Sequence, residues 1–369
     1  MKRDIRLGVV NHSDLGEMEC KLATDVIPFA GVNLRIVRRD ISGDDGGDTD
    51  ASPTSNADGD DDDDWVDPNF FDDGYTVAAT TGFCRVWEGA EVLTRLLEDD
   101  SSGDESLRRR VAGKRVLELG AGVGLCGIAA ASVGAHVMCT DLEAVVEGVI
   151  YRNIGENTDT SSETGTLTAP SSSSSPPWRM SEHIAGGNGG TCVAQVLDWT
   201  TSIDASIQAQ RRLSARRRVL FREDTTGATS WPCIGKDDDV TDDDDDAQCV
   251  NDPRDCELVM AAECLWLREL VDPFCETVID LMRAARERRG IELPCVLSFR
   301  DRSSKDTAKD KVKDDEGGES PGGAFVPVSD VVSAFEAKGC GWRTLHASPS
   351  TEDAGYHVHV FEITPPPVA

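Results

Sequence analysis

The stretch Val116-Leu-Glu-Leu-Gly120-Ala-Gly122-Val-Gly124-Leu-Cys-Gly127 decides the fold of this 369-residue chain. An apolar run of strand length at residues 115–119 is followed by closely spaced glycines and then by small residues that favour a helix at 125–132. Glycines let a backbone approach a ligand closely, and the first turn of a helix offers free N–H groups. The stretch therefore predicts a strand, a Gly-rich turn and a helix that together bind a ligand.

Asp141 supplies the second half of this motif. It ends the next predicted strand, residues 136–140, twenty-one positions after Gly120. An acidic side chain at that place accepts hydrogen bonds from ribose hydroxyls. The two features together predict a cofactor that contains adenosine.

Two classes of cofactor remain open on these residues. The spacing Gly122-Val-Gly124-Leu-Cys-Gly127 also satisfies the dinucleotide pattern G-x-G-x-x-G, so NAD and FAD are candidates. Glu118 lies two residues before Gly120, where a carboxylate repels a pyrophosphate but can reach the ammonium group of S-adenosylmethionine. The chain also lacks a recognisable second domain for hydride chemistry. These features favour S-adenosyl-L-methionine.

The segments outward from this unit alternate between strand and helix patterns. Such alternation predicts an α/β fold whose mostly parallel sheet has helices on both faces. The last two strands follow each other after one helix, which indicates an antiparallel hairpin at one edge. An extended pattern at residues 26–37 indicates a short β extension near the N-terminus. The further predicted strands are 191–197, 256–261, 294–299, 341–346 and 356–363, and the further helices are 87–97, 142–150, 270–282 and 329–338.

Long polar and acidic stretches interrupt this pattern. Residues 43–73 hold thirteen Asp and residues 237–246 hold eight, against a formal net charge of −31. Acidic runs with few apolar groups cannot bury enough surface to offset the entropy of ordering. We therefore expect a β extension over residues 1–42, an acidic disordered loop over 43–73 and one domain over 74–369. Within the domain we expect disordered inserts at about 155–190, 222–254 and 302–323.

Composition argues against several classes of partner. The one dense basic cluster, residues 211–218, precedes an acidic run, so no electropositive face for nucleic acid is expected. Residues 1–10 carry Asp4 and few consecutive apolar side chains, and no apolar run approaches the ~20 residues that cross a bilayer. Twelve Cys without a Cys-x-x-Cys pair are typical of reduced thiols rather than a metal site. We expect a monomer of the cytoplasm or nucleus, with no metal, nucleic acid or membrane.

Five segments, in this order, resemble the seven-β-strand protein-lysine methyltransferases of the methyltransferase-like group. Each segment is modest alone, but their order and spacing make the set specific, and the resemblance extends from about residue 30 to 363. It implies a seven-stranded Rossmann-like methyltransferase sheet, S-adenosyl-L-methionine as cofactor and a lysine side chain of a protein as acceptor. The segments are Val86-Trp87, residues 116–124, Thr140-Asp141-Leu142, Leu197-Asp198-Trp199 and Ala261-Ala262-Glu263-Cys-Leu-Trp266.

The resemblance also implies which residues bind the cofactor. Trp87 is similar to the family tryptophan that lines the cofactor pocket, and Asp198 and Trp199 are similar to the pair that flanks the adenine. Without the family, both tryptophans are equally well explained as core aromatics, and Asp198 as a turn residue. The predicted cofactor-binding residues are Trp87, Glu118, Gly120, Ala121, Gly122, Gly124, Asp141, Leu142, Asp198, Trp199 and Ala262.

The acceptor site follows from the expected topology. Ligands of open α/β sheets bind beyond the carboxyl ends of the strands where the strand order reverses, which places Glu263 and Trp266 near the methyl group. A lysine amine, with an unperturbed pKa near ~10.4, must lose a proton before it attacks. Glu263 can hold the ammonium group while Trp266 walls the stem and offers a cation–π face. In the alternative, Glu263 caps the following helix near Arg268 and Trp266 is a core residue.

Many members of the family have Asp, then Tyr or Phe, where this chain has Glu263 and Trp266, so the shape of the acceptor pocket differs. The prediction is transfer of a methyl group to a lysine side chain of a protein substrate. Two alternatives stay open. One is an N-methyltransferase of a small amine, and the other is a non-catalytic module that binds the cofactor and acts through protein contacts of its acidic loops.

Overall fold

The computed structural model describes residues 2–12, 16–39, 85–159, 175–222, 250–301, 326–352 and 356–367. The predicted disordered stretches 43–73 and 302–323 lie outside the described residues. Residues 160–174 and 223–249, which make up much of the other two predicted inserts, lie outside them as well.

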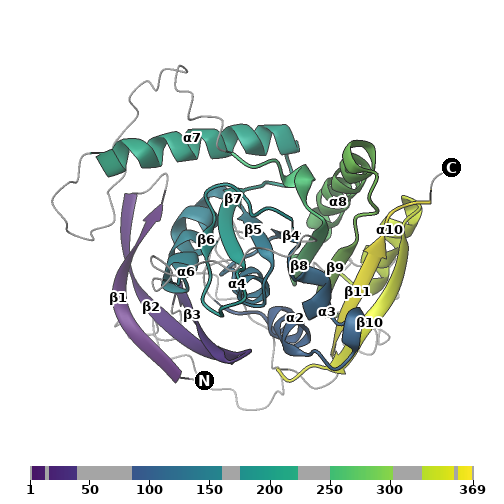
Figure 1. Cartoon of the computed structure of the whole chain (residues 1–369), viewed down its shortest axis with the longest axis horizontal. Coiled ribbons are helices and arrows are strands. Elements are labelled where there is room, and N and C mark those ends of the chain that lie inside the picture. The colour runs from purple at the N-terminus through teal and green to yellow at the C-terminus, as the bar shows by residue number, and fades with distance from the viewer. Residues whose placement is uncertain are drawn as a thin grey trace, which may run out of the picture.

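A mixed sheet forms the centre of the protein (Figure 1). Its strands are β4 (Arg115–Leu119), β5 (His136–Asp141), β6 (Glu182–His183), β7 (Thr191–Val196), β8 (Leu258–Ala262), β9 (Cys295–Asp301), β10 (Gly341–Pro349) and β11 (His357–Thr364). Their order across the sheet is β10-β11-β9-β8-β4-β5-β7-β6. The five central strands pair in parallel, whereas β11 runs antiparallel to both β9 and β10. The predicted α/β fold with an antiparallel C-terminal edge is therefore confirmed, and the strand order reverses between β4 and β8.

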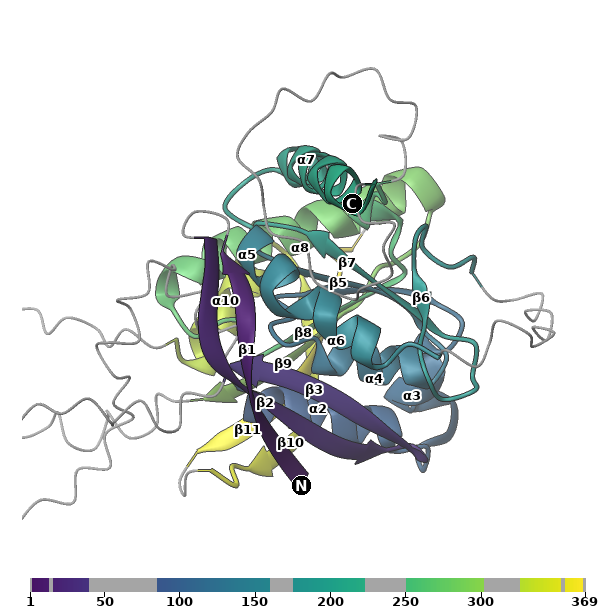
Figure 2. The same cartoon turned by 90° about the vertical axis from the view of Figure 1, so that its left-hand side faces the viewer.

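Helices bury both faces of this sheet. Alternate residues of each strand belong to different core clusters, as Val116 and Leu117 of β4 do, because successive side chains point to opposite faces. Long helix α7 (Ile203–Arg222) lies along the β7 edge and contributes to both clusters (Figures 1 and 2). One face is covered by α2 (Glu88–Glu98), α4 (Leu125–Ser132) and α6 (Tyr151–Glu156), and the other by α8 (Arg268–Arg289) and α10 (Val328–Ala337).

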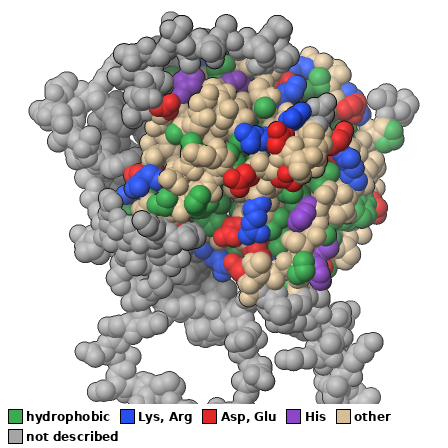
Figure 3. All heavy atoms as spheres, turned by 60° about the horizontal axis from the view of Figure 1, so that its bottom comes forward, with side chains coloured by type: hydrophobic (Ala, Val, Ile, Leu, Met, Phe, Trp, Pro, Cys, Tyr) green, Lys and Arg blue, Asp and Glu red, His purple; other side chains and the backbone are tan. Residues whose placement is uncertain are grey.

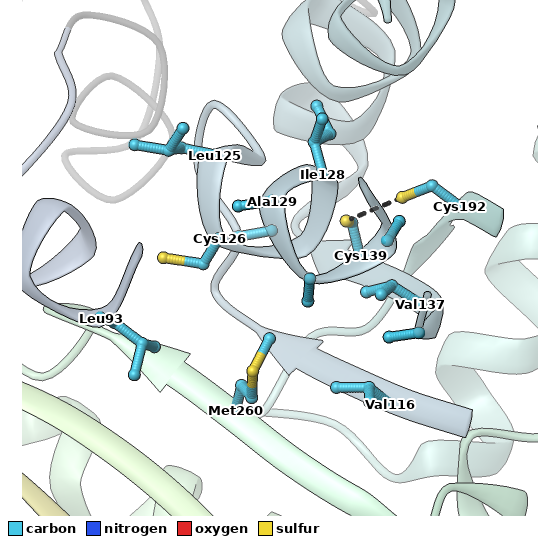
Figure 4. Close-up of a cluster of buried hydrophobic side chains, with 14 of the residues drawn as sticks. Leu93, Val116, Leu125, Cys126, Ile128, Ala129, Val137, Cys139, Cys192 and Met260 are labelled. Carbon is cyan, nitrogen blue, oxygen red and sulfur yellow. Dashed lines mark hydrogen bonds between the residues drawn. The ribbon is translucent and has the colours of Figure 1, made fainter. Parts of the chain in front are cut away.

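The core is tightest where α4 crosses the sheet. Figure 4 shows Cys126, Ile128 and Ala129 of α4 above strand residues that include Val137 and Cys139. The thiol of Cys139 lies 3.4 Å from the thiol of Cys192 on β7. Small side chains along α4 let the helix approach the sheet closely, which brings its first turn to the end of β4.

Residues 175–190 correct the predicted insert at 155–190. Trp178 is only 4% exposed, and its Nε1 donates a hydrogen bond to the carbonyl of His136 at 2.8 Å. Residues Glu182–His183 pair antiparallel with β7 and add an eighth strand to the seven that were predicted. The prediction of disorder is wrong for this part because one tryptophan and a two-residue strand leave no periodic pattern in a Ser/Gly/Pro-rich segment.

A separate antiparallel sheet precedes the domain. It consists of β1 (Lys2–His12), β2 (Gly16–Phe29) and β3 (Val32–Arg39), and its last two strands form the hairpin indicated by residues 26–37. Phe29, Leu34 and Ile36 are buried in the same cluster as α2 and α4. The described part of this sheet thus packs on the domain (Figure 2).

Two asparagines hold this sheet on the domain, Asn153 of α6 and Asn157 at the C-cap of that helix, and Asn153 also connects the sheet to the Gly-rich turn. The amide of Asn153 accepts from the N–H of Val37 at 2.8 Å and donates to the carbonyls of Val37 at 2.9 Å and Val123 at 2.7 Å. One helical turn later, Asn157 exchanges the same pair of bonds with the backbone of Arg35 at 2.9 and 2.8 Å. The two side-chain amides thus pair with backbone N–H and C=O groups of β3, as the backbone of a neighbouring strand would.

Candidate functional site

A pocket of about 330 Å³ lies at the carboxyl ends of β4, β5, β7 and β8, where the strand order reverses. This volume is in the range of small-ligand pockets, and the position is the one expected for open α/β sheets. The pocket brings together every predicted site residue except Gly124, which begins α4 just behind it. The predicted residues that line it are Trp87, Glu118, Gly120, Ala121, Gly122, Asp141, Leu142, Asp198, Trp199, Ala262, Glu263 and Trp266.

The Gly-rich turn forms the floor of this pocket. Gly120, Gly122 and Gly124 have φ angles of +64°, +54° and +79°, a left-handed conformation that favours glycine. A Cβ atom on Gly120 would lie 2.7 Å from Cys264 Cβ and 3.0 Å from the ring of Trp199. The turn therefore needs glycine both for its backbone angles and for space.

Asp141 holds the turn from the end of β5. Its two carboxylate oxygens accept hydrogen bonds from the N–H groups of Gly122 and Leu142, each at 2.8 Å. Burial raises the pKa of Asp141 to about 6, although these two bonds act in the opposite direction. A carboxylate has about four acceptor positions. Asp141 therefore retains capacity for ribose hydroxyls in the pocket.

Glu118 is a buried carboxyl at the end of β4. Its Oε2 accepts a hydrogen bond from the N–H of Gly127, in the first turn of α4, at 3.0 Å. Burial raises the pKa of Glu118 to about 8, against the lowering effect of hydrogen bonds with Cys139 and Gly127. A cationic group in the pocket would stabilise its ionised form.

Trp199 supplies a group that suits a bound ligand. Its ring packs edge-on against Phe274, with ring centroids 5.2 Å apart. Its Nε1 is buried and has no hydrogen-bond partner among the described residues. A buried donor without a partner costs free energy, so a ligand that accepts a hydrogen bond there fits the site. The Gly-rich turn, Asp141 and this indole fit an adenosine-containing cofactor.

Glu263 lines the pocket, but it caps a different helix from the one expected. Its Oε2 accepts a hydrogen bond from the N–H of Gly89 at 2.5 Å, and its Oε1 lies 3.6 Å from Nε of Arg300. The carboxylate therefore caps the N-terminus of α2, not that of α8, which begins at Arg268. Its φ of +52° is left-handed, a conformation that costs a non-glycine residue roughly 1–2 kcal/mol. The alternative that Glu263 caps the helix that follows it is thus wrong, whereas its contact with the acceptor amine stays a prediction.

Arg85 is a lining residue that the sequence did not reveal. Its guanidinium lies 4.4 Å from the ring centroid of Trp87, and it donates two hydrogen bonds to the carboxylate of Glu352 at 2.7 and 2.8 Å. Arg85 directly precedes the Val86-Trp87 segment, but its partner Glu352 is distant in the chain, so the sequence did not indicate this pair. Trp87 itself is the N-cap residue of α2, which explains how this helix positions it at the pocket.

Other kinds of site have no comparable support in the described part of the chain. No group of three or more His, Cys, Asp or Glu among these residues is arranged to hold a metal ion. None of the described helices is long and apolar enough to cross a membrane. On the face seen in Figure 3, basic and acidic side chains are interspersed.

Comparison with known proteins identifies part of the chain. Residues 77–168 match the model of the lysine methyltransferase family. Protein N-lysine methyltransferase METTL21A of Danio rerio is 47% identical over 72 residues, which cover 20% of this chain and 29% of that protein. Protein-lysine methyltransferase METTL21E of Bos taurus is 40% identical over 75 residues, which cover 20% of this chain and 24% of that protein. The matched part thus spans less than a third of these relatives.

Solved structures are more distant. Magnesium protoporphyrin IX methyltransferase from Synechocystis, with bound SAH, aligns with a TM-score of 0.37 and 13% identity, over 80% of this chain and 91% of that one. This likeness is too low to carry an argument. The family match agrees with the prediction of S-adenosyl-L-methionine as the cofactor. The segment that matches the lysine methyltransferase family, residues 77–168, holds β4, the Gly-rich turn and Asp141, in agreement with the resemblance seen in the sequence.

Proposed function

We propose that this chain is a protein-lysine N-methyltransferase that uses S-adenosyl-L-methionine. The observation that carries the proposal is that a single pocket contains both the residues predicted to bind the cofactor and the residues predicted to bind the acceptor amine. Glu118 and Asp141 lie on the side matched by the lysine methyltransferase family, and Glu263 and Trp266 lie on the side formed by the loop after β8. Such an arrangement aligns two reactants, which is the main contribution that a protein makes to a displacement at carbon.

On the cofactor side, each group has a separate role. Asp141 accepts hydrogen bonds from the ribose, while its bonds to Gly122 and Leu142 keep the carboxylate in place. Glu118 faces the ammonium group of the amino acid portion, and Trp199 lies against the adenine. The cofactor, when bound, supplies a methyl group on a positively charged sulfur.

On the acceptor side, Glu263 holds the amine. The hydrogen bond from Gly89 and the ion pair with Arg300, 3.6 Å away, orient the carboxylate. The carboxylate then accepts a hydrogen bond from the substrate ammonium, which loses a proton to solvent before the amine attacks the methyl group. Trp266 flanks the aliphatic stem and excludes water.

The proposed activity is tested by transfer of labelled methyl groups to a whole-cell extract, followed by identification of the modified residue. Label on lysine side chains of proteins is the expected result. Label only in the small-molecule fraction would favour an amine N-methyltransferase. Binding of S-adenosylmethionine without any transfer would favour the non-catalytic module.

Glu263→Gln is expected to lower methyl transfer by about 100-fold, because loss of the charge misplaces the amine. The amide oxygen can still accept the bond from Gly89, so the affinity for S-adenosylhomocysteine should change little, whereas loss of the buried ion pair with Arg300 should lower the melting temperature. Trp266→Ala should impair substrate use more than cofactor binding, and Trp266→Tyr should be milder. Calorimetry, thermal melts and transfer rates on the same preparations check these results. A fully active Glu263→Gln protein would contradict the acceptor site.

We expect the Glu118 carboxyl to lose its proton when the cofactor binds. Burial raises its pKa to about 8, so the carboxyl is mostly protonated at pH 7. An ammonium group beside it favours the ionised form, and release of up to about one proton per cofactor is expected. Calorimetry at pH 7 in buffers of different ionisation enthalpy measures this number. Glu118→Gln should bind without the release, and equal heats in all buffers for the unaltered protein would contradict the contact.

A further inference from the structure

Arg300, at the end of β9, is a buried cation among three carboxylates. Its Nη1 lies 2.9 Å from Glu352 Oε2 and 3.8 Å from Glu88 Oε2, and its Nε lies 3.6 Å from Glu263 Oε1. The side chains of Arg300, Glu88 and Glu263 are 5%, 2% and 1% exposed, whereas that of Glu352 is 37% exposed. The three carboxylates come from three distant parts of the chain, so the guanidinium joins α2, the loop after β8 and the β10–β11 turn.

Glu88 links this cluster to the β10–β11 turn. Its carboxylate accepts hydrogen bonds from the N–H and the hydroxyl of Thr351 at 2.5 and 2.8 Å, and from the hydroxyl of Ser350 at 2.5 Å. Burial alone would raise the pKa of Glu88, but these bonds and Arg300 lower it. Glu88 is therefore a buried anion, and as the first residue of α2 it fixes the start of that helix.

Gly89, the next residue, is held from both sides. Its N–H donates to Glu263, and its carbonyl accepts from the hydroxyl of Ser298 at 2.8 Å. A Cβ atom on Gly89 would lie 2.9 Å from Glu263 Oε2, so helix and carboxylate are in close contact. Since Trp87 is the N-cap of α2 and lines the pocket, the same contacts set the place of its indole.

We propose that Arg300 is a positioning residue for methyl transfer, whose guanidinium holds Glu263 and the Trp87 end of α2 in one fixed arrangement. Arg300 does not line the pocket, so it acts through these two residues. Without its charge, three carboxylates would face one another, and like charges at such distances repel. An acceptor amine misplaced by about 1 Å can lose ~100-fold in rate, so loss of this arrangement affects transfer first. The inference rests on the proposed function.

The test compares Arg300→Lys with Arg110→Lys. Lysine keeps the charge in both but cannot contact several carboxylates in one plane. Arg110 is a matched control because it pairs with the buried Glu362 on β11 and does not line the pocket. Arg300→Lys should lower kcat/KM by about tenfold or more, while its affinity for S-adenosylhomocysteine stays within about threefold. Arg110→Lys should change neither quantity.

A second measurement does not depend on turnover. The Trp87 signal is the difference in fluorescence between each protein and the same protein with Trp87→Phe, with and without S-adenosylhomocysteine. Arg300→Lys should alter this signal, and Arg110→Lys should leave it unchanged. If Arg300→Lys does not fold, Glu88→Gln replaces it, because Glu88 contacts the same guanidinium. Glu352 is less suitable, because it also pairs with Arg85, which stacks on Trp87.

The outcomes separate the two proposals. Lower kcat/KM with nearly unchanged cofactor affinity and an altered Trp87 signal supports the positioning role. An unchanged kcat/KM, or a loss explained wholly by weaker cofactor binding, overturns it. If the unaltered protein transfers no methyl group to protein, the proposed function fails. The Trp87 signal is then the only test of the positioning role of Arg300. An unchanged signal in the Arg300 variant overturns that role.

Discussion

Asp141→Ala is expected to weaken the binding of S-adenosylhomocysteine by about 100-fold or more. Hydrogen bonds to a charged group contribute roughly 1.5–3 kcal/mol each, and the variant lacks the carboxylate that we propose accepts two bonds from the ribose. It also frees the N–H of Gly122, which Asp141 now holds at 2.8 Å, so the Gly-rich turn loses a fixed point. Calorimetry measures the change. Asp204→Ala is a suitable control, because Asp204 is exposed on α7 and pairs with Arg254.

The same carboxyl predicts a pH dependence. Burial raises the pKa of Asp141 to about 6, so the free protein takes up a proton there as the pH falls from 7 to 5. A protonated carboxyl cannot accept hydrogen bonds from both ribose hydroxyls as well as a carboxylate does. The affinity for S-adenosylhomocysteine should therefore fall as the pH falls from 7 to 5. Asp141→Asn should lack this part of the pH dependence. An affinity for S-adenosylhomocysteine that is equal in Asp141→Ala and the unaltered protein would remove the ribose assignment.

Gly127→Ala is expected to destabilise the fold by about 3 kcal/mol or more, at the upper end of overpacking effects. A Cβ atom at this place would lie 2.3 Å from the thiol of Cys139 and 2.4 Å from Glu118 Oε2. Because α4 rests directly on β4 and β5, the helix would have to move away and would break the bond between Gly127 and Glu118. For a domain of this size the melting temperature should drop by roughly 10 °C.

Gly155→Ala provides the matched control. Gly155 also lies in a helix, α6, but a Cβ atom there would meet nothing within 4 Å. Alanine is the better helix former, so this variant should be unchanged or slightly more stable, by up to about 1 kcal/mol. Thermal and urea unfolding of both variants measure the difference. Equal stabilities would show that α4 does not press on the sheet at Gly127.

The sequence predicted the central unit accurately because local and tertiary requirements agree there. The strand at 115–119 and the helix at 125–132 coincide with β4 and α4 at every boundary. Glycine spacing, a short apolar run and small helical residues each indicate the same structure, so no outside contact had to be known. The expected reversal of strand order between β4 and β8 then predicted the position of the pocket correctly.

Other features depend on contacts between distant residues. The sequence did not indicate the length of α7, which is twenty residues, because the polar composition of this helix gives a weak apolar pattern. One alternative had Glu263 cap the helix that follows it, but the carboxylate caps α2 through Gly89, which lies 174 positions away. The role of Arg300 likewise requires knowing that β9 ends beside α2. Patterns in a single sequence carry no information about contacts between residues that are distant in the chain.

The amide of Asn153 has a consequence for how the chain responds to its cofactor. One nitrogen donates both to Val37 of the N-terminal sheet and to Val123 of the Gly-rich turn, so the two segments share a donor. Coupling is reciprocal: the free energy by which a bound ligand strengthens docking of the sheet equals the free energy by which the docked sheet strengthens ligand binding. Residues of the N-terminal sheet, which touch no ligand, would then gain protection against hydrogen exchange when a ligand fills the pocket. Removal of that sheet would in turn weaken ligand binding in the pocket.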